Sequence, residues 1–177
     1  MELRGFFATV FAFLFTVEVY SRPFISFDSV KLTVSGCTNG GFYMRINTIN
    51  CENKNSRMEC PAMADGETNS SPSTLFTLER NTSIARLNKL RCISFNNTYS
   101  LMVQGNNVSF VNVSCEKGGN NVWFKFKKLP DDSGSYLGFF IPGSTMCLTR
   151  SCNGTLSVEK VNSTTDRKCF FRQRIIR

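Results

Sequence analysis

The chain has 177 residues and carries 21 Lys and Arg against 13 Asp and Glu, but no His, so its formal net charge at pH 7 is +8. The lack of His excludes Ser-His-Asp and Cys-His catalytic sites and any imidazole base that titrates near neutrality. The adjacent carboxylates Asp131 and Asp132 lie in a Pro-Asp-Asp-Ser-Gly turn, where the side chains should diverge, which disfavours a carboxylate-dyad enzyme. We therefore expect a binding protein rather than an enzyme, with no cofactor.

The first residues have the pattern of a secretory signal peptide. An uncharged apolar run from Phe6 to Val17 follows Arg4, and small residues around Ser21 fit a signal-peptidase site. Removal of residues 1–21 would leave residues 22–177 as a single domain of 177 − 21 = 156 residues, with a net charge of 20 − 11 = +9. No second apolar run reaches about 18 residues, so we expect a secreted, extracellular protein without membrane insertion.

The cysteines predict a disulfide-bonded domain. Those that follow the predicted cleavage site are Cys37, Cys51, Cys60, Cys92, Cys115, Cys147, Cys152 and Cys169. An even number in a secreted chain indicates up to four disulfides, and the spacing favours two local pairs, Cys51 with Cys60 and Cys147 with Cys152. Zinc binding is disfavoured, because there is no His and no Cys pair with two-residue spacing, so no metal is expected.

Seven Asn-X-Ser/Thr sequons predict N-glycosylation at several exposed turns. They begin at Asn69, Asn81, Asn96, Asn107, Asn112, Asn153 and Asn162. These positions are therefore expected to mark the surface of the folded domain.

Short apolar runs recur from position 75 to the end of the chain, separated by turns rich in Asn, Gly and Asp. The runs are 75–78, 84–87, 90–95, 99–103, 108–113, 122–126, 136–141, 146–149, 155–158 and 169–171. Many short strands without a convincing helix predict an all-β sandwich or barrel, and recurring aromatic-rich strands favour a threefold barrel. By contrast, the Asn-, Ser-, Glu- and Pro-rich residues 47–74 are predicted to be a disulfide-linked insertion with at most one short strand, near 57–59.

Residues 30–46 have the sequence form of a β-hairpin, with apolar alternation on both sides of a two-glycine turn. The segment Cys37-Thr38-Asn39-Gly40-Gly41-Phe42-Tyr43-Met44-Arg45-Ile46 resembles the opening hairpin of the fibroblast growth factors. Weaker resemblance continues in order through 99–108, 124–129 and 144–171. It implies a β-trefoil of twelve short strands with pseudo-threefold symmetry, and a secreted ligand of a receptor tyrosine kinase ectodomain with heparan sulfate as co-receptor. We expect a monomer before receptor engagement.

The basic residues of the last third are the candidate heparan sulfate site. If residues 159–168 form a loop, Arg150, Lys160, Arg167 and Lys168 can converge on one face and attract a sulfated polysaccharide through Coulomb attraction and counterion release. In the resembling family, an amide at the position of Asn39 contributes to the same site. Scattered solvated cations are the alternative interpretation, and sugars on the flanking sequons would screen the loop.

Tyr43 and Arg45 of the first hairpin, together with Tyr136, are the candidate receptor contacts. A barrel tyrosine bonded to backbone is the alternative interpretation for Tyr136. The chain departs from the resembling family at Gly36, where an aromatic residue is common, at Lys127, where Glu is common, and at 172–174, where the family ends its last strand in Phe-Leu-Pro.

Two further basic groups are not assigned to a binding site. Arg172, Arg174 and Arg177 are predicted to form a solvated C-terminal tail, and extra heparan sulfate affinity or a proprotein-cleavage site is the alternative interpretation. Lysines alternate with aromatic residues over 123–128, which is typical of a half-buried strand rather than a nucleic-acid platform, and secretion also disfavours a nucleic-acid partner.

Two other classes of protein remain open. The segment 132–136 resembles the tyrosine corner of an immunoglobulin-like receptor or adhesion module, although Gly138 stands where that motif has Cys. A trefoil that is not a growth factor, such as a cytokine, a lectin or a protease inhibitor, is the other alternative.

Overall fold

The computed structural model describes residues 28–35, 41–65, 72–80, 90–129 and 136–176. The predicted signal peptide, the predicted strand at 84–87, and Cys37, Asn39, Asn69, Asn81 and Arg177 lie outside the described residues. Among the residues that are described, no helix is long and apolar enough to cross a membrane.

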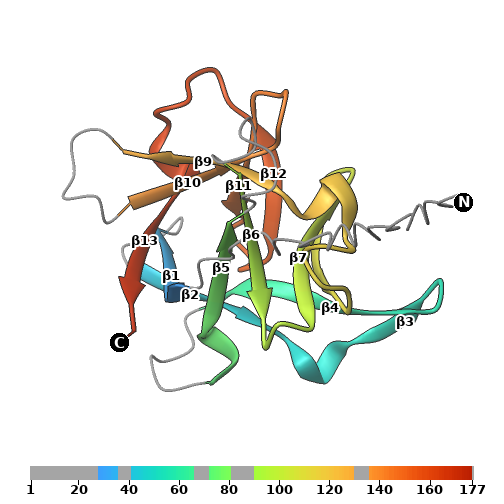
Figure 1. Ribbon diagram of the computed structural model, residues 1–177. Helices are drawn as coiled ribbons and strands as arrows, with labels where there is room; N and C mark the ends of the chain where they lie inside the picture. Colours follow the sequence, from blue (N-terminus) through green and yellow to red (C-terminus); the bar gives the residue numbers. More distant parts are fainter. Residues whose placement is uncertain (1–27, 36–40, 66–71, 81–89, 130–135, 177) are drawn as a thin grey trace, which may run out of the picture.

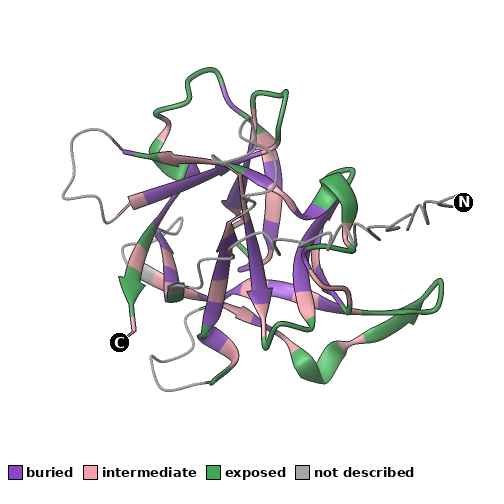
Figure 2. Ribbon diagram, viewed as in Figure 1, coloured by how far each residue is buried: buried purple, intermediate pink, exposed green. Residues whose placement is uncertain are grey.

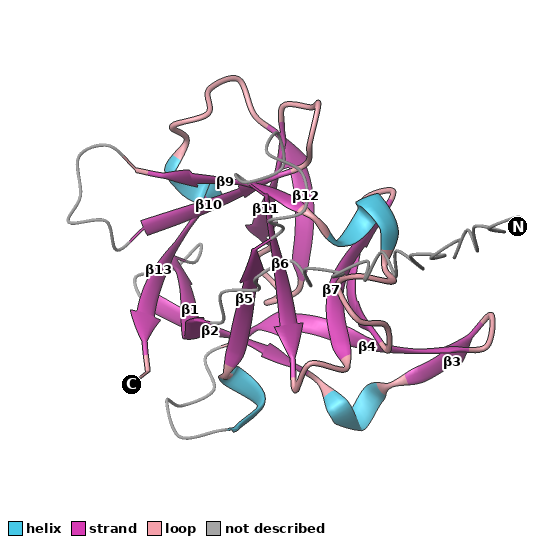
Figure 3. Ribbon diagram, viewed as in Figure 1, coloured by secondary structure: helices cyan, strands magenta, loops and turns pink. Residues whose placement is uncertain are grey.

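The described chain is built almost entirely of short strands. They are β1 (Asp28–Ser35), β2 (Gly41–Ile46), β3 (Glu52–Lys54), β4 (Arg57–Ala64), β5 (Phe76–Arg80), β6 (Leu90–Phe95), β7 (Tyr99–Gln104), β8 (Asn107–Val111), β9 (Phe124–Lys128), β10 (Tyr136–Phe140), β11 (Met146–Arg150), β12 (Leu156–Lys160) and β13 (Phe170–Ile175). Short 3-10 helices lie between some of them, namely η1 (Thr48–Asn50), η2 (Pro72–Thr74), η4 (Gly119–Val122) and η5 (Arg167–Cys169) (Figure 3).

Six strands close into an antiparallel barrel. The ring runs β1, β5, β6, β9, β10, β13 and back to β1, and each neighbouring pair is joined by backbone pairing. Closure leaves none of these six with a free edge. Alternate residues point inward, as in β1, where Val30, Leu32 and Val34 are buried and Thr33 is only half-buried.

Three hairpins cover one end of this barrel, and we call them the cap. They are β2 with β4, β7 with β8, and β11 with β12, and each is entered from a barrel strand, β1, β6 or β10. The hairpins also pair with one another, through β4 and β8, through β8 and β12, and through a bridge between Met63 and Thr155. The described strands thus form three units of four, which is the predicted twelve-strand pseudo-threefold barrel, and β3 is an additional strand.

The prediction of at most one short strand within residues 47–74 is wrong. β4 has eight residues and pairs with both β2 and β8, so it belongs to the threefold arrangement, and β3 pairs with it to form a hairpin that projects from the body (Figure 1). The residues that β4 buries are small, namely Cys60, Ala62 and Ala64. Small side chains give little hydrophobic alternation, so the sequence pattern that reveals the other strands is absent here.

The disulfides confirm one predicted pair and correct the other. Cys51 is bonded to Cys60 as predicted, and Cys92 is bonded to Cys115. The predicted pair Cys147–Cys152 is wrong, because Cys147 is bonded to Cys169. From Cys147 the chain continues as extended strand to Arg150, a span of roughly 10 Å, and a disulfide requires Cα atoms within about 7 Å. Cys152 is also disulfide-bonded.

The hydrophobic core has one large part and two small ones. The large cluster fills the barrel and its cap, and its aromatic rings include the stacked pair Phe76 and Phe110, 5.2 Å between centres. The two small clusters each contain a disulfide, Cys92–Cys115 in one and Cys147–Cys169 in the other. These two disulfides therefore lie outside the main core, whereas Cys60 of the Cys51–Cys60 disulfide belongs to the large cluster.

Candidate functional site

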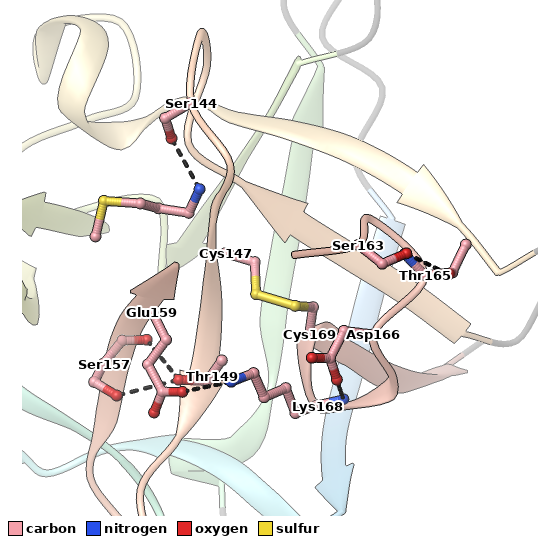
Figure 4. The surroundings of a disulfide bond; sticks show 11 residues. Ser144, Cys147, Thr149, Ser157, Glu159, Ser163, Thr165, Asp166, Lys168 and Cys169 are labelled. Atoms are coloured by element: carbon pink, nitrogen blue, oxygen red, sulfur yellow. Dashed lines mark hydrogen bonds and ion pairs between the residues drawn. A yellow bond between two sulfur atoms is a disulfide. The ribbon is translucent and has the colours of Figure 1, made fainter. Parts of the chain in front are cut away.

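The first candidate surface is centred on η5, which is fixed at both ends. Asp166 caps it by accepting a hydrogen bond from the backbone N–H of Lys168 (3.2 Å), and Cys169 anchors its last turn to β11 through the disulfide with Cys147 (Figure 4). Lys168 Nζ lies 2.9 Å from a carboxylate oxygen of Glu159 on β12. These contacts place η5 beside the end of β12, where Lys160 lies.

Three of the predicted sulfate-binding residues belong to this surface. Lys160, Arg167 and Lys168 are all exposed, and we call them the η5 basic cluster. The hydrogen bond to Glu159 raises the pKa of Lys168, so its ammonium group is charged at neutral pH. Glu159 and Asp166 stand among the three cations, which reduces their formal charge from +3 to 3 − 2 = +1.

Arg150, the fourth predicted sulfate-binding residue, is engaged by the protein itself. Its Nε donates a hydrogen bond to the backbone carbonyl of Ala64, and its guanidinium carbon lies 4.0 Å from the ring centre of Phe42. Cation–π contacts of this kind stabilise folded proteins by about 0.5–2 kcal/mol. Arg150 thus joins β11 to β2 and β4, and the structure does not place it in the η5 basic cluster.

The second candidate surface is a row of side chains across four neighbouring strands. Tyr136 on β10 is directly opposite Arg172 on β13, Arg172 is opposite Thr33 on β1, and Thr33 is opposite Tyr43 on β2. Directly paired residues of antiparallel strands project to the same side of a sheet, here the outer side of the barrel. Arg172 is exposed and the other three are half-buried. We call Tyr136, Arg172, Thr33 and Tyr43 the outer row.

Cations surround the outer row, whose one charged member is Arg172. Arg174 is exposed and lies opposite Lys31. This pair is two residues along β13 and β1 from the pair of Arg172 and Thr33, and so projects to the same side. No Asp or Glu occurs within β9, β10 or β13, although β1 begins with Asp28, and β9 adds Lys125 and Lys127, which lie opposite Phe140 and Gly138. The prediction of a solvated tail is therefore wrong for Arg172 and Arg174, because both belong to a barrel strand.

The predicted receptor contacts divide into two kinds. Tyr43 and Tyr136 both belong to the outer row, and Tyr136 also packs against the small cluster that contains the Cys147–Cys169 disulfide. Arg45 is instead clamped by Asp65, with Nε 2.8 Å and a terminal guanidinium nitrogen 2.6 Å from the two carboxylate oxygens. Only 14% of the Arg45 side chain is accessible, so its guanidinium serves the fold.

The described sequons all have exposed asparagines. They are Asn96, Asn107, Asn112, Asn153 and Asn162, which lie in turns or at strand ends. The strands β1, β10 and β13 contain no sequon, so the central strands of the outer row carry no predicted glycan.

A polar groove in the cap is a feature that the sequence analysis missed. It has a volume of about 580 Å³ and lies between the β3–β4 hairpin, the turn from β7 to β8, and the start of β12. Its lining consists mainly of amide, carboxylate and hydroxyl side chains and includes no aromatic residue. These segments are far apart in the sequence, so only the folded chain brings them together.

No protein-family model matches the sequence, and no curated protein matches it either. Among solved structures, the chain is similar to a designed threefold-symmetric protein, ThreeFoil, with 10% identity and a TM-score of 0.57 over 81% of this chain and 96% of that one. It is also similar to the BEL β-trefoil in an apo crystal form, with 17% identity and a TM-score of 0.55 over 83% of this chain and 93% of that one.

At these identities the similarity establishes the fold, which is a β-trefoil as predicted. The immunoglobulin-like alternative is wrong, because that fold packs two separate sheets, whereas six strands here close into one barrel.

Proposed function

We propose that this protein is a secreted signalling ligand of fibroblast growth factor type. It binds a receptor tyrosine kinase ectodomain through the outer row and a sulfated polysaccharide of heparan sulfate type through the η5 basic cluster. The observation that carries the proposal is the strand register, which gathers Tyr43, Arg172 and Tyr136 from distant parts of the sequence into one row. Secretion is supported by the N-terminal sequence and by the disulfides, which are typical of oxidising compartments.

The composition of the outer row suits a protein partner. Tyr and Arg are enriched among the residues that dominate binding energy in protein interfaces, because they combine a large apolar surface with polar groups. The row has no acidic residue on β10 or β13, and β1 contains one, Asp28, five residues from Thr33, so the complementary surface of the receptor is expected to be acidic. Charge complementarity of this kind chiefly accelerates association and makes it sensitive to salt.

The η5 basic cluster suits a polyanion of modest affinity. Arg167 and Lys168 lie on a capped and disulfide-anchored turn and Lys160 lies on β12, so little backbone entropy is lost when a sulfated chain binds. Glu159 and Asp166 oppose that binding, and sulfate groups would compete with Glu159 for Lys168. Affinity should therefore fall as salt rises, because binding releases counterions, and the slope should be modest, since at most three cations contact the sulfated chain.

Receptor binding is tested with residues 22–177 and a panel of immobilised receptor tyrosine kinase ectodomains, in the presence of a heparin oligosaccharide. Tyr43→Ala and Tyr136→Ala should each weaken binding about tenfold or more. Tyr99→Ala is the matched control, because Tyr99 is a half-buried tyrosine on β7, outside the row. Absence of binding to every ectodomain, or equal losses for Tyr99→Ala and the row variants, would contradict the proposal.

Sulfate binding is tested by elution from immobilised heparin in a salt gradient. Replacing Lys160, Arg167 and Lys168 with Ala should move elution to clearly lower salt than wild type. The control replaces three exposed cations elsewhere, Lys54, Arg57 and Lys117, and so removes the same charge. Equal shifts for both triple variants, or elution of the wild type below about 0.15 M salt, would exclude a localised site.

A further inference from the structure

We propose that the polar groove of the cap binds the first sugars of an N-linked glycan attached to Asn107. This inference rests on the proposed secretion, because N-glycosylation occurs on secreted chains. It assigns a ligand to a concave surface that neither the receptor nor the sulfate proposal uses.

The attachment point lies on the groove itself. Asn107 is exposed and lines the groove, and so does Ser109, the hydroxyl residue of the same sequon. Asn107 is the first residue of β8 and is paired with Gln104 on β7 and with Ser157 on β12. Pairing on both sides fixes the backbone at this position, so the first sugar would start from a defined point at the groove.

The walls offer the groups that a sugar needs. On the β3–β4 hairpin, the carboxylate residues Glu52 and Glu59 are directly opposite each other, and Lys54 Nζ lies 2.9 Å from an oxygen of Glu52. Asn106 and Ser157 line other parts of the groove. These side chains can accept from sugar hydroxyls and donate to acetamido oxygens. The volume of about 580 Å³ lies within the range of about 300–1,000 Å³ that is usual for small-ligand sites.

Covalent attachment compensates for the low affinity that is expected of such a groove for a sugar. The groove has no aromatic residue on which a sugar ring can stack, so a free saccharide should bind poorly. A sugar attached at the rim is present at an effective concentration in the millimolar range, at which a few hydrogen bonds are sufficient for occupancy. This difference favours the protein's own glycan over a saccharide from solution.

The β3–β4 hairpin is the element that the glycan would stabilise. All three residues of β3 are exposed, and its backbone pairs only with β4 among the described strands (Figure 2). Its backbone hydrogen bonds should therefore open readily in the absence of a cover. Sugars in the groove would cover the face of the hairpin that contains Glu52 and Glu59.

The experiment compares matched sequon variants made in a glycosylating eukaryotic host. Asn107→Gln and Ser109→Ala both remove the sequon, whereas Ser109→Thr preserves it. Asn112→Gln removes the next sequon, whose asparagine is exposed and lies outside the groove lining. Mass spectrometry gives the occupancy of each site, and hydrogen exchange is measured on peptides that cover residues 52–59.

Asn107→Gln and Ser109→Ala should accelerate exchange over residues 52–59 about tenfold, while Ser109→Thr and Asn112→Gln should leave it unchanged. The inference is overturned if Asn107 is unoccupied while other sequons are glycosylated, or if Asn107→Gln and Asn112→Gln have the same effect. If no sequon is occupied, both this inference and the proposed secretion fail. If Asn107 alone is unoccupied, only this inference fails, so the two failures can be told apart.

Discussion

The Arg45–Asp65 ion pair allows a direct test of whether Arg45 stabilises the fold or contacts a receptor. Arg45 donates two hydrogen bonds to the carboxylate of Asp65, and the accessible fractions of the two side chains are 14% and 27%. The ion pair ties β2 to the chain just after β4. Replacing Arg45 with Ala should therefore destabilise the protein without removing a receptor contact.

The expected cost follows from the geometry. Hydrogen bonds to charged groups contribute about 1.5–3 kcal/mol, and loss of one member of a fully buried ion pair costs about 3–5 kcal/mol. Because this pair is partly solvated, water compensates for part of the loss, and we expect Arg45→Ala to cost about 2 kcal/mol. For a domain of this size that lowers Tm by roughly 4–8 °C.

The assay is urea unfolding of Arg45→Ala, Asp65→Ala and the double variant with the disulfides intact. A double-mutant cycle should give a coupling free energy of about 1–2 kcal/mol, because the two side chains contact each other directly. A coupling near zero would refute the structural role. A loss of receptor affinity without a loss of stability would assign Arg45 to the interface instead.

Other predictions concern the barrel wall. Glu79 accepts a 2.6 Å hydrogen bond from Ser94, and its burial raises the pKa of its carboxyl group. The native state therefore favours the protonated carboxyl. The stability that the protonated form contributes is lost as the pH rises through the raised pKa. Glu79→Gln should therefore raise Tm at pH 7 and have little effect near pH 4, and an equal effect at both pH values would contradict the argument. Gly138→Ala should cost about 1–3 kcal/mol in urea unfolding, because the new Cβ would lie 2.7 Å and 3.0 Å from two phenylalanine rings, and an unchanged midpoint would refute this contact. Replacing both Cys147 and Cys169 with Ser should cost roughly 3 kcal/mol in the same assay, and peptide mapping of the wild type should recover the 147–169 linkage rather than 147–152.

Much of the barrel could be predicted from local pattern. The run 90–95 coincides with β6, because a short apolar run followed by an Asn-Asn turn indicates a buried strand and a chain reversal. β4 was predicted only as a short strand near 57–59, because the residues that it buries, Cys60, Ala62 and Ala64, are small. Hydrophobic patterning reports burial of large side chains, so a strand that buries alanines gives no such signal.

The candidate site depended on partners that sequence cannot show. The charge of Arg150 and Arg45 was visible, but their engagement by the Ala64 carbonyl and by Asp65 comes from chain segments distant in sequence. The same holds for the outer row, because only strand register places Tyr43 and Tyr136 on either side of Arg172. Local composition therefore could not distinguish side chains that are engaged within the fold from side chains that are available to a partner.

The central claim is that this protein activates a receptor tyrosine kinase with the help of a sulfated polysaccharide. The most direct measurement is receptor tyrosine phosphorylation in cells that lack heparan sulfate and express individual receptors, treated with residues 22–177 with and without soluble heparin. The account predicts phosphorylation of at least one receptor when both are added, and its loss in the double variant Tyr43→Ala/Tyr136→Ala. No phosphorylation of any receptor under either condition would contradict it.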